Sequence, residues 1–406
     1  MQKVIVVGGG AAGLFAAYSA SCLCKKVVLL EKNEKLGKKL YITGKGRCNV
    51  TNNVDVSEFI NNVIANPKFL YGALNELSPK DVIEFFENND CKLKTERGNR
   101  VFPVSDKASD ITNTLRKALE KNGVEICLNT TVQGVIVDKG CVKGVNTDVG
   151  FISSNSVIVC TGGISYPATG STGDGYLFAK EVGHSIIDLK PSLVGIELKG
   201  NEFIPLQGVS LKNVSISVKM NEKEIYADFG EMIFTHFGVS GPIILSASCI
   251  INRVNATKQT IEIDLKPALT MQMLDKRLLR EFSKDNNKII SNKLRALLPQ
   301  ALIELVLRRA NVNSDKRCCD ITKEERYAII SVLKCLKFDI KRLRSIEEAI
   351  MTAGGVSVKE INPKTMESKL VKGLFFAGEV LDVDALTGGF NVQIAFSTGY
   401  VAGKNA

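Results

Sequence analysis

The segment VIVVGGGAAGLFAAYSASC, residues 4–22, constrains the fold more than any other part of the chain. An apolar run that ends in small residues could form the core of a secretion signal. The glycines Gly8, Gly9 and Gly10 in its middle argue against that interpretation, because glycine weakens a helical core. The alternative is a strand, a tight turn and a helix, and every feature of the segment fits it.

The residues around the glycines support this second interpretation. Residues 4–7 form a β-branched run, residues 14–20 favour a helix, and the apolar run 26–30 ends in an acidic residue. Strand, GxGxxG turn, helix, strand and terminal acid, in this order, form a dinucleotide-binding fingerprint. We predict that Gly8 permits the tight turn, that Gly10 leaves a place for a pyrophosphate and that Gly13 lets the helix pack closely on the strand. We also predict that Glu31 binds a ribose hydroxyl.

The composition is that of an ordinary globular protein and excludes several classes. The chain has 406 residues, and no run approaches the roughly 18 apolar residues that a membrane span needs. Its 11 cysteines contain no CxxC pair and it has only two histidines, so we expect no metal site and a reducing, cytoplasmic location. The net charge of +10 fits either a solvated basic surface or attraction for an anion.

Two further regions favour FAD over NAD as the dinucleotide. Residues 129–160 predict a β-meander that leads into the strand SVIVCTGG, 156–163, as in glutathione-reductase-type FAD domains. Near the C-terminus, a buried strand at 374–377 is followed by Gly378 and Glu379, and a helix is expected from about Asn391. The N-terminus of that helix would stabilise a reduced flavin at its N1–C2=O edge.

Five motifs resemble one family both in their residues and in their order along the chain. They are EKNEKLGKKLYITGKGRCNVTNN, TGGISYPATGSTGDGY, FTHFGVSGP, GGVSVKEINPKTMESKLVKGLFFAGEVLD and TGGFNVQIAFSTG. Together they resemble the bacterial BaiN/YhiN-like flavoproteins over essentially the whole chain. This resemblance implies non-covalent FAD, a doubly wound glutathione-reductase-type FAD-binding domain, and two inserted domains. It also implies an NAD(P)- and FAD-dependent oxidoreductase, with 3-dehydro-bile-acid delta-4,6-reductase and aminoacetone oxidase among the described activities.

The resemblance also implies positions for the cofactor contacts. The contacts are expected at the pyrophosphate turn, in a glycine-rich loop, at a backbone group that binds adenine and at the distal end of the cofactor. Besides the residues named above, we expect them to involve Ala12, Lys32, Arg47, Cys48, Asn49, Val132, Thr161, Gly162, Gly389, Phe390, Asn391 and Val392. Cys48 lacks a second cysteine at the CxxxxC spacing of disulfide reductases. We therefore expect it to pack against the flavin rather than to act as a redox thiol.

The pattern of residues along the sequence predicts an α/β protein with a discontinuous FAD domain. We place its two parts at 1–191 and 346–406, because both carry cofactor motifs. Residues 192–266 alternate with period two and predict an inserted antiparallel β domain. Residues 267–345, which we expect to be helical to about Phe338, predict an inserted helical domain.

The function expected from these features is reduction of an enone, such as a 3-oxo-Δ4 or Δ4,6 steroid intermediate, by hydride from reduced flavin. Proton delivery is also needed, and Tyr166 is the candidate donor, with His236 a weaker one. A loop tyrosine packed on the cofactor is the alternative for Tyr166. No second complete GxGxxG exists, so NADH or NADPH would bind only transiently.

Two other functions remain open at this point. One is a flavin amine oxidase acting on a small aminoketone. The other is an RNA-binding or RNA-modifying flavoprotein, which would depend on the basic charge and on the basic helical stretch 289–310. We expect the partner to be a small molecule, which could be an anion, and we expect neither a nucleic acid nor a membrane. No feature of the sequence indicates an oligomeric state.

Overall fold

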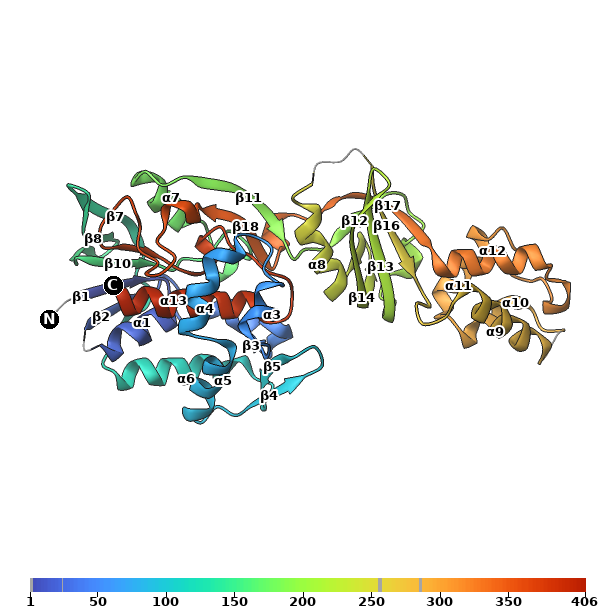
Figure 1. Ribbon diagram of the computed structural model, residues 1–406, viewed down its shortest axis with the longest axis horizontal. Helices are drawn as coiled ribbons and strands as arrows, with labels where there is room; N and C mark the ends of the chain where they lie inside the picture. Colours follow the sequence, from blue (N-terminus) through green and yellow to red (C-terminus); the bar gives the residue numbers. More distant parts are fainter. Residues whose placement is uncertain (1–2, 24, 255–257, 285–286) are drawn as a thin grey trace. The chain divides into compact units, whose positions relative to one another are not determined.

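The computed structural model describes residues 3–23, 25–254, 258–284 and 287–406. The chain divides into two compact units, one formed by Met1–Ser192 with Ser345–Ala406 and the other by Leu193–Arg344 (Figure 1). The first unit therefore contains both the N-terminal and the C-terminal glycine motifs. The division of the insertion into a β domain and a helical domain stays a prediction. Within the described residues, no helix combines the length and the apolar character needed to cross a bilayer.

A five-stranded parallel sheet is the centre of the first unit. Its order is β19-β10-β1-β2-β6, so that β1 lies between the strand after the meander and the strand that ends before Glu31. After their first residues, which are Lys3, Lys26 and Ser156, the inner strands are apolar and buried, as expected for strands covered on both faces. The strands are β1 (Lys3–Val7), β2 (Lys26–Leu30), β6 (Glu125–Cys127), β10 (Ser156–Val159) and β19 (Leu374–Phe376).

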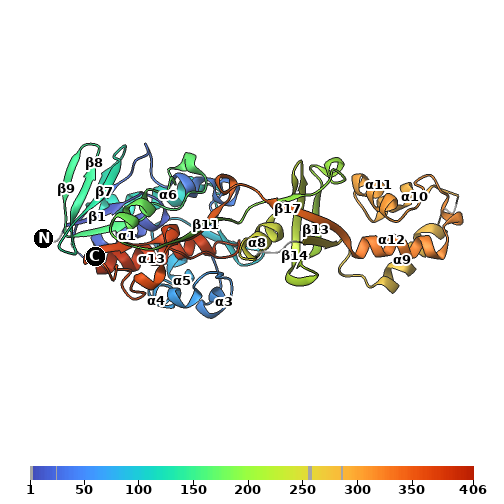
Figure 2. The same cartoon turned by 90° about the horizontal axis from the view of Figure 1, so that it is seen from above.

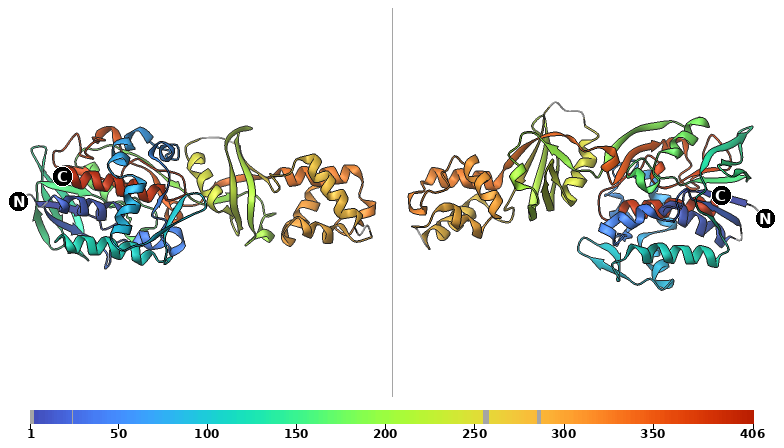
Figure 3. Two further views of the ribbon diagram at one scale, coloured as in Figure 1. Left: turned by 60° about the horizontal axis from the view of Figure 1, so that its bottom comes forward. Right: turned by 180° about the vertical axis from the view of Figure 1, so that it is seen from behind.

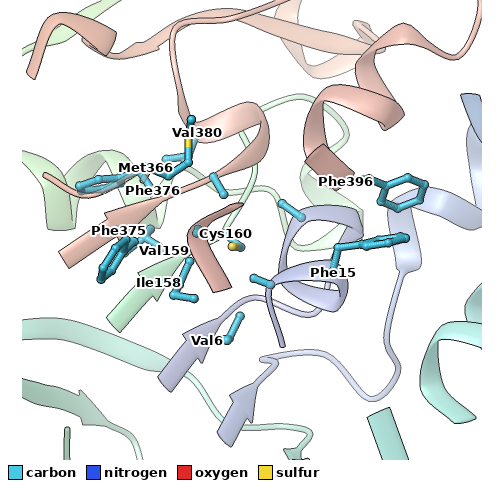
Figure 4. Packing of buried hydrophobic residues seen from close by; sticks show 14 of the residues in the cluster. Val6, Phe15, Ile158, Val159, Cys160, Met366, Phe375, Phe376, Val380 and Phe396 are labelled. Carbon is cyan, nitrogen blue, oxygen red and sulfur yellow. The ribbon is translucent and has the colours of Figure 1, made fainter. Parts of the chain in front are cut away.

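Two helices from opposite ends of the chain pack together on this sheet. α1 (Ala11–Cys22) lies beside α13 (Phe390–Asn405) in both Figures 1 and 2. Their contact includes Phe15 and Phe396, whose ring centroids are 4.5 Å apart. Figure 4 shows the rings of Phe15 and Phe396 beside each other, apart from the labelled strand residues Val6, Ile158 and Val159. A β-carbon added at Gly399 would lie 2.1 Å from the backbone oxygen of Ala12, so the close approach requires glycine.

The remaining elements of the first unit form two small antiparallel sheets, a strand pair and a cover of helices (Figure 3). The predicted meander is present as β7, β8 and β9, and α5 begins with a capping box formed by Ser78 and Asp81. The strands are β3 (Thr51–Asn52), β4 (Leu93–Glu96), β5 (Arg100–Pro103), β7 (Val132–Asp138), β8 (Cys141–Thr147), β9 (Gly150–Ser153), β11 (Ile186–Ser192) and β18 (Met351–Val356). The helices are α2 (Lys38–Ile42), α3 (Val56–Ile60), α4 (Tyr71–Glu76), α5 (Pro79–Asn88), α6 (Ala108–Lys121) and α7 (Asp174–Glu181).

A closed barrel with helices against it forms the second unit. The barrel order is β12-β15-β14-β13-β16-β17. Its strands are β12 (Ile196–Leu198), β13 (Ser210–Met220), β14 (Lys223–Thr235), β15 (Gly238–Ser240), β16 (Gln259–Asp264) and β17 (Leu336–Leu343). The helices are α8 (Pro242–Ile251), α9 (Met271–Ser283), α10 (Ile290–Lys293), α11 (Gln300–Arg309) and α12 (Lys323–Lys334). Buried residues of the barrel and of the helices form one continuous core.

The helical stretch of the insertion ends earlier than the sequence predicted. α12 stops at Lys334, and residues 336–343 form β17, which pairs with β16 and β12 and closes the barrel. The expectation of helix to about Phe338 is therefore wrong. The sequence LKFDIKRL alternates with period two and buries Leu336, Phe338 and Ile340, which is a strand pattern.

Candidate functional site

The glycine turn after β1 has the geometry of a phosphate-binding turn. A β-carbon at Gly13 would lie 1.8 Å from the backbone oxygen of Gly8, so α1 can approach β1 only with glycine there. A β-carbon at Gly10 would meet no atom within 4 Å. The space beside Gly10 is thus open at the N-terminus of α1, where free N–H groups and the helix dipole favour an anion.

Glu31 closes this turn from the end of β2. One carboxylate oxygen accepts the N–H of Gly9 at 2.7 Å, and the other accepts the backbone N–H of Asn33 at 2.8 Å. The carboxylate therefore fixes the shape of the turn. Its predicted bond to a ribose hydroxyl stays a prediction.

The C-terminal ends of the neighbouring strands β10 and β19 lie beside this turn. Thr161 and Gly162 follow β10, and Gly378 follows β19. A β-carbon at Gly378 would lie 2.7 Å from the Cβ of Ala12, so the C-terminal motif packs directly on α1. The buried Oγ1 of Thr161 has no hydrogen-bond partner in the described part of the chain. This atom packs against α7, because a β-carbon added at Gly175 would lie 2.2 Å from it.

The N-terminus of α13 forms the distal part of the site. Its N-cap, Gly389, has a φ of +101°, and a β-carbon there would lie 3.0 Å from Oδ1 of Asn49. That oxygen is also buried and without a partner among the residues described. The first turn of α13 carries no acidic residue, so its dipole is available to an anionic or electron-rich group.

The side chains at the start of α13 are engaged within the protein. Asn391 bonds the backbone of Ala385 through both its Oδ1 and its Nδ2, at 2.9 and 2.8 Å. The ring of Phe390 packs on that of Phe59, with centroids 5.0 Å apart. Contacts of Phe390 and Asn391 to a cofactor would therefore use their backbone N–H groups. Val392 is half-buried on the next position.

Glu379 anchors a network that the sequence analysis missed. Its carboxylate lies 2.7 and 3.0 Å from Nζ of Lys39 and accepts Oγ–H of Ser165 at 2.9 Å. It also accepts the backbone N–H of Thr352 at 2.8 Å. The network joins α2, the loop after β10, and β18 to the C-terminal motif. No local pattern marks Lys39, since its partner is 340 residues away.

Other predicted contacts have partners of their own in the structure. The guanidinium of Arg47 lies 2.8 Å from Glu96 and 4.0 Å from the ring centroid of Phe102. Nζ of Lys32 lies 2.7 Å from the carboxylate of Asp174 at the start of α7. Val132 begins β7 and is buried. The roles of these three in cofactor binding stay predictions.

Cys48 is buried, and burial raises the pKa of its thiol to about 12. A thiol in this state is almost entirely protonated near neutral pH and is a poor nucleophile. These properties suit the packing role expected for Cys48. Among the described residues, no group of three or more histidine, cysteine or acidic side chains is arranged to hold a metal ion.

The two candidate proton donors lie in different units. Tyr166 is half-buried, has a φ of +50°, and directly follows Ser165 of the Glu379 network. His236 is exposed in the second unit, in the turn between β14 and β15, beside the ring of Phe237. The structure thus places Tyr166 in the unit that holds the glycine turn, and its catalytic role stays a prediction.

The residues present fit a bound FAD. The open space at Gly10 suits a pyrophosphate, and the buried Oδ1 of Asn49, without a partner among the described residues and beside the N-cap of α13, suits a polar group of a ligand. The N-termini of α1 and α13 both lie in the first unit, as an extended dinucleotide requires. The fold and the site therefore define a FAD-binding oxidoreductase of the glutathione-reductase type.

The family follows from a comparison with known proteins. The chain belongs to the family described as HI0933-like protein Rossmann domain, whose model matches residues 2–405. This confirms the resemblance drawn from the motifs.

Two curated relatives span nearly the whole chain. A 3-dehydro-bile acid delta(4,6)-reductase of Clostridium scindens is 29% identical over 412 residues, covering 100% of this chain and 99% of that protein. A ribosomal RNA dihydrouridine synthase of Haemophilus influenzae is 30% identical over 409 residues, covering 98% and 96%.

A solved structure supports the fold alone. The 3-ketosteroid-delta4-(5alpha)-dehydrogenase of Rhodococcus jostii matches with a TM-score of 0.53 at 14% identity, covering 100% of this chain and 96% of that one. The doubly wound fold class predicted from the sequence is therefore confirmed.

Proposed function

We propose that this chain is a FAD-dependent reductase of a carbon–carbon double bond conjugated to a carbonyl group. The observation that carries the proposal is the bond type shared by its relatives. A bile-acid delta(4,6)-reductase saturates double bonds conjugated with a 3-oxo group, and dihydrouridine is uridine saturated at C5–C6, next to the C4 carbonyl. The names of two relatives, each about 30% identical to this chain, thus describe one kind of reduction on two unlike substrates.

The chain would hold FAD between the glycine turn and the N-terminus of α13. The open position at Gly10 would take the pyrophosphate, in the middle of the cofactor, where the N-terminus of α1 would stabilise its negative charge. The N-terminus of α13 would stabilise negative charge on the reduced isoalloxazine ring, at one end of the cofactor. When bound, FAD would supply hydride chemistry for the β-carbon of the conjugated system, and a side chain of the protein would give a proton to the α-carbon. Tyr166 is the proposed proton donor in the first unit, and NADH or NADPH is the proposed source of electrons.

The first substrate candidate is a small enone, such as a 3-oxo-Δ4,6 steroid acid. The C. scindens relative supports it, because the match covers 100% of this chain. The net positive charge of the chain would also suit an acidic substrate.

The second candidate is a uracil base in RNA, which a specific observation favours. Residues 193–344 carry 25 Lys and Arg against 17 Asp and Glu, so the insertion holds +8 of the net charge of +10. The first unit, although larger, is close to neutral. A localised basic unit is the electrostatic feature expected for binding a phosphate backbone. The charge distribution therefore favours RNA over a small enone.

Product analysis separates these candidates. The FAD-loaded chain is incubated without oxygen with NADH or NADPH and either a 3-oxo-Δ4,6 bile acid or a ribosomal RNA transcript. Mass spectrometry of the acid, or of nucleosides from digested RNA, should show gain of two hydrogen atoms in one of them. Reduction of the flavin by aminoacetone, with peroxide formed in air, would instead indicate the amine oxidase. Saturation of neither substrate would contradict the proposal.

A further inference from the structure

Asn52, at the end of β3, has a side-chain amide whose orientation is fixed by two hydrogen bonds. Its Nδ2 donates to the backbone oxygens of Gly98 and Gly388, each at 3.0 Å. Only the NH₂ end of an amide can donate to two carbonyl oxygens, so the position of Oδ1 follows from these bonds. Oδ1 of Asn49, by contrast, is without a hydrogen-bond partner in the described part of the chain.

The Oδ1 atom of Asn52 is a buried acceptor that lacks a donor. Asn52 is 3% exposed, and Oδ1 has no hydrogen-bond partner among the residues that the structure describes. Buried polar atoms of native proteins are almost always paired, and leaving one unpaired is destabilising. A donor from a bound group is therefore expected at this atom.

The position of Asn52 indicates which donor this is. Gly388, its bonding partner, directly precedes Gly389, the N-cap of α13. The N-terminus of α13 offers N–H groups, which suit the C2 carbonyl of an isoalloxazine ring. On that ring the atom next to C2 is N3, which carries a hydrogen and must donate. A helix end that donates, with a fixed acceptor beside it, matches this sequence of groups.

We propose that Oδ1 of Asn52 accepts a hydrogen bond from N3–H of the isoalloxazine ring and so fixes the orientation of the flavin. The inference deepens the proposed function and rests on FAD as its cofactor. Asn52 is thus a positioning residue, since it holds the ring and transfers neither hydride nor proton.

The test compares FAD with 3-methyl-FAD, which lacks the N3 hydrogen. Dissociation constants are measured on the apoprotein by flavin fluorescence, for the wild type, for Asn52→Ala and for Asn53→Ala. Asn53 is the matched control, because it is the neighbouring asparagine and is exposed. The wild type and the control should prefer FAD by about tenfold, or about 1.4 kcal/mol, whereas Asn52→Ala should prefer it by less than about threefold.

A second measurement keeps the inference testable if Asn52→Ala does not fold. With ¹⁵N-labelled FAD bound to the wild type, the N3–H proton should be visible by NMR, shifted downfield and protected from exchange. An N3–H proton in rapid exchange, or equal binding of FAD and 3-methyl-FAD by the wild type, would overturn the inference and leave the proposed function intact. Failure of the wild type to bind FAD at all would contradict the proposed function itself.

Discussion

Nζ of Lys39 and the carboxylate of Glu379 form a close ion pair, at 2.7 and 3.0 Å, between α2 and the C-terminal motif. The side chains are 21% and 10% exposed. Ser165 bonds both partners, at 2.6 Å to Lys39 and 2.9 Å to Glu379. The pair therefore ties together α2, the loop after β10 and the C-terminal motif.

Loss of Lys39 should destabilise the first unit. Lys39→Met leaves the mostly buried Glu379 carboxylate without its cation, and we expect the free energy of unfolding to fall by about 1–3 kcal/mol. Denaturant unfolding of the apoprotein measures it. Lys80→Met is the control, because Lys80 and its partner Glu84 are 83% and 57% exposed and such pairs contribute less than about 1 kcal/mol. Equal effects of the two substitutions would contradict the role given to Lys39.

Two glycines of the same turn should respond in opposite ways to alanine. Gly13→Ala brings a β-carbon against the backbone oxygen of Gly8 and should cost at least about 3 kcal/mol of stability. Gly10→Ala meets no protein atom, so the apoprotein should keep its stability within about 0.5 kcal/mol. Its FAD affinity should nevertheless fall at least about tenfold, because the added carbon occupies the phosphate space. Unchanged affinity in Gly10→Ala would place the pyrophosphate elsewhere.

His184 should make stability depend on pH below its ordinary pKa. Its ring is fully buried, with Nδ1 3.1 Å from Glu360 and Nε2 2.8 Å from Ser368. Burial lowers the pKa of His184, although Glu360 opposes the effect. The unfolded chain then binds a proton more readily, so stability is complete above about pH 6.5 and is lost as the pH falls from there, by at most about 1.4 kcal/mol per unit.

Denaturant unfolding at about pH 7.5, 6.5 and 5.5 tests this expectation. His184→Gln should remove the dependence between the two lower values. His236→Gln is the matched control, since His236 is the other histidine of the chain and is exposed. Retention of the full wild-type dependence by His184→Gln would exclude His184 as its source.

Binding of RNA, if RNA is the substrate, should depend on the insertion. Lys276 on α9 and Arg308 on α11 are exposed basic residues of the second unit. The double variant Lys276→Gln/Arg308→Gln should lower the log–log salt slope of binding by about 1.4–1.8, as loss of two phosphate contacts requires. Filter binding over a range of salt concentrations gives the slope. The control Lys80→Gln/Lys117→Gln removes two exposed charges from the first unit and should leave the salt slope unchanged. A lower slope in this control, with an unchanged slope in the double variant of the insertion, would indicate that RNA binds to the first unit.

Local patterns predicted the elements of the site because each depends on neighbouring residues. The turn at Gly8–Gly13, the meander and the helix after Gly389 follow from hydrophobic period and from glycine spacing alone. The strand at 336–343 was missed, since a short alternating run directly after a long amphipathic helix extends the apparent helical pattern.

Pairings between distant segments could not be predicted in this way. Lys39 meets Glu379 and Asn52 meets Gly388 only because the chain returns to the sheet after the insertion. The same pairings show that Glu379, expected to contact FAD directly, is already bonded to Lys39, Ser165 and Thr352. The chemistry of such groups is decided by their neighbours in space, which residue types and spacing do not encode.

The most direct test of the central claim is an anaerobic single turnover. The FAD-loaded chain is reduced with one equivalent of dithionite and mixed in a stopped-flow instrument with the RNA transcript or the 3-oxo-Δ4,6 acid. We expect one of them to restore the visible absorbance of oxidised FAD and to yield one saturated bond per flavin. A flavin that stays reduced with both substrates, but is reoxidised by oxygen, would contradict the assignment as a reductase of conjugated double bonds.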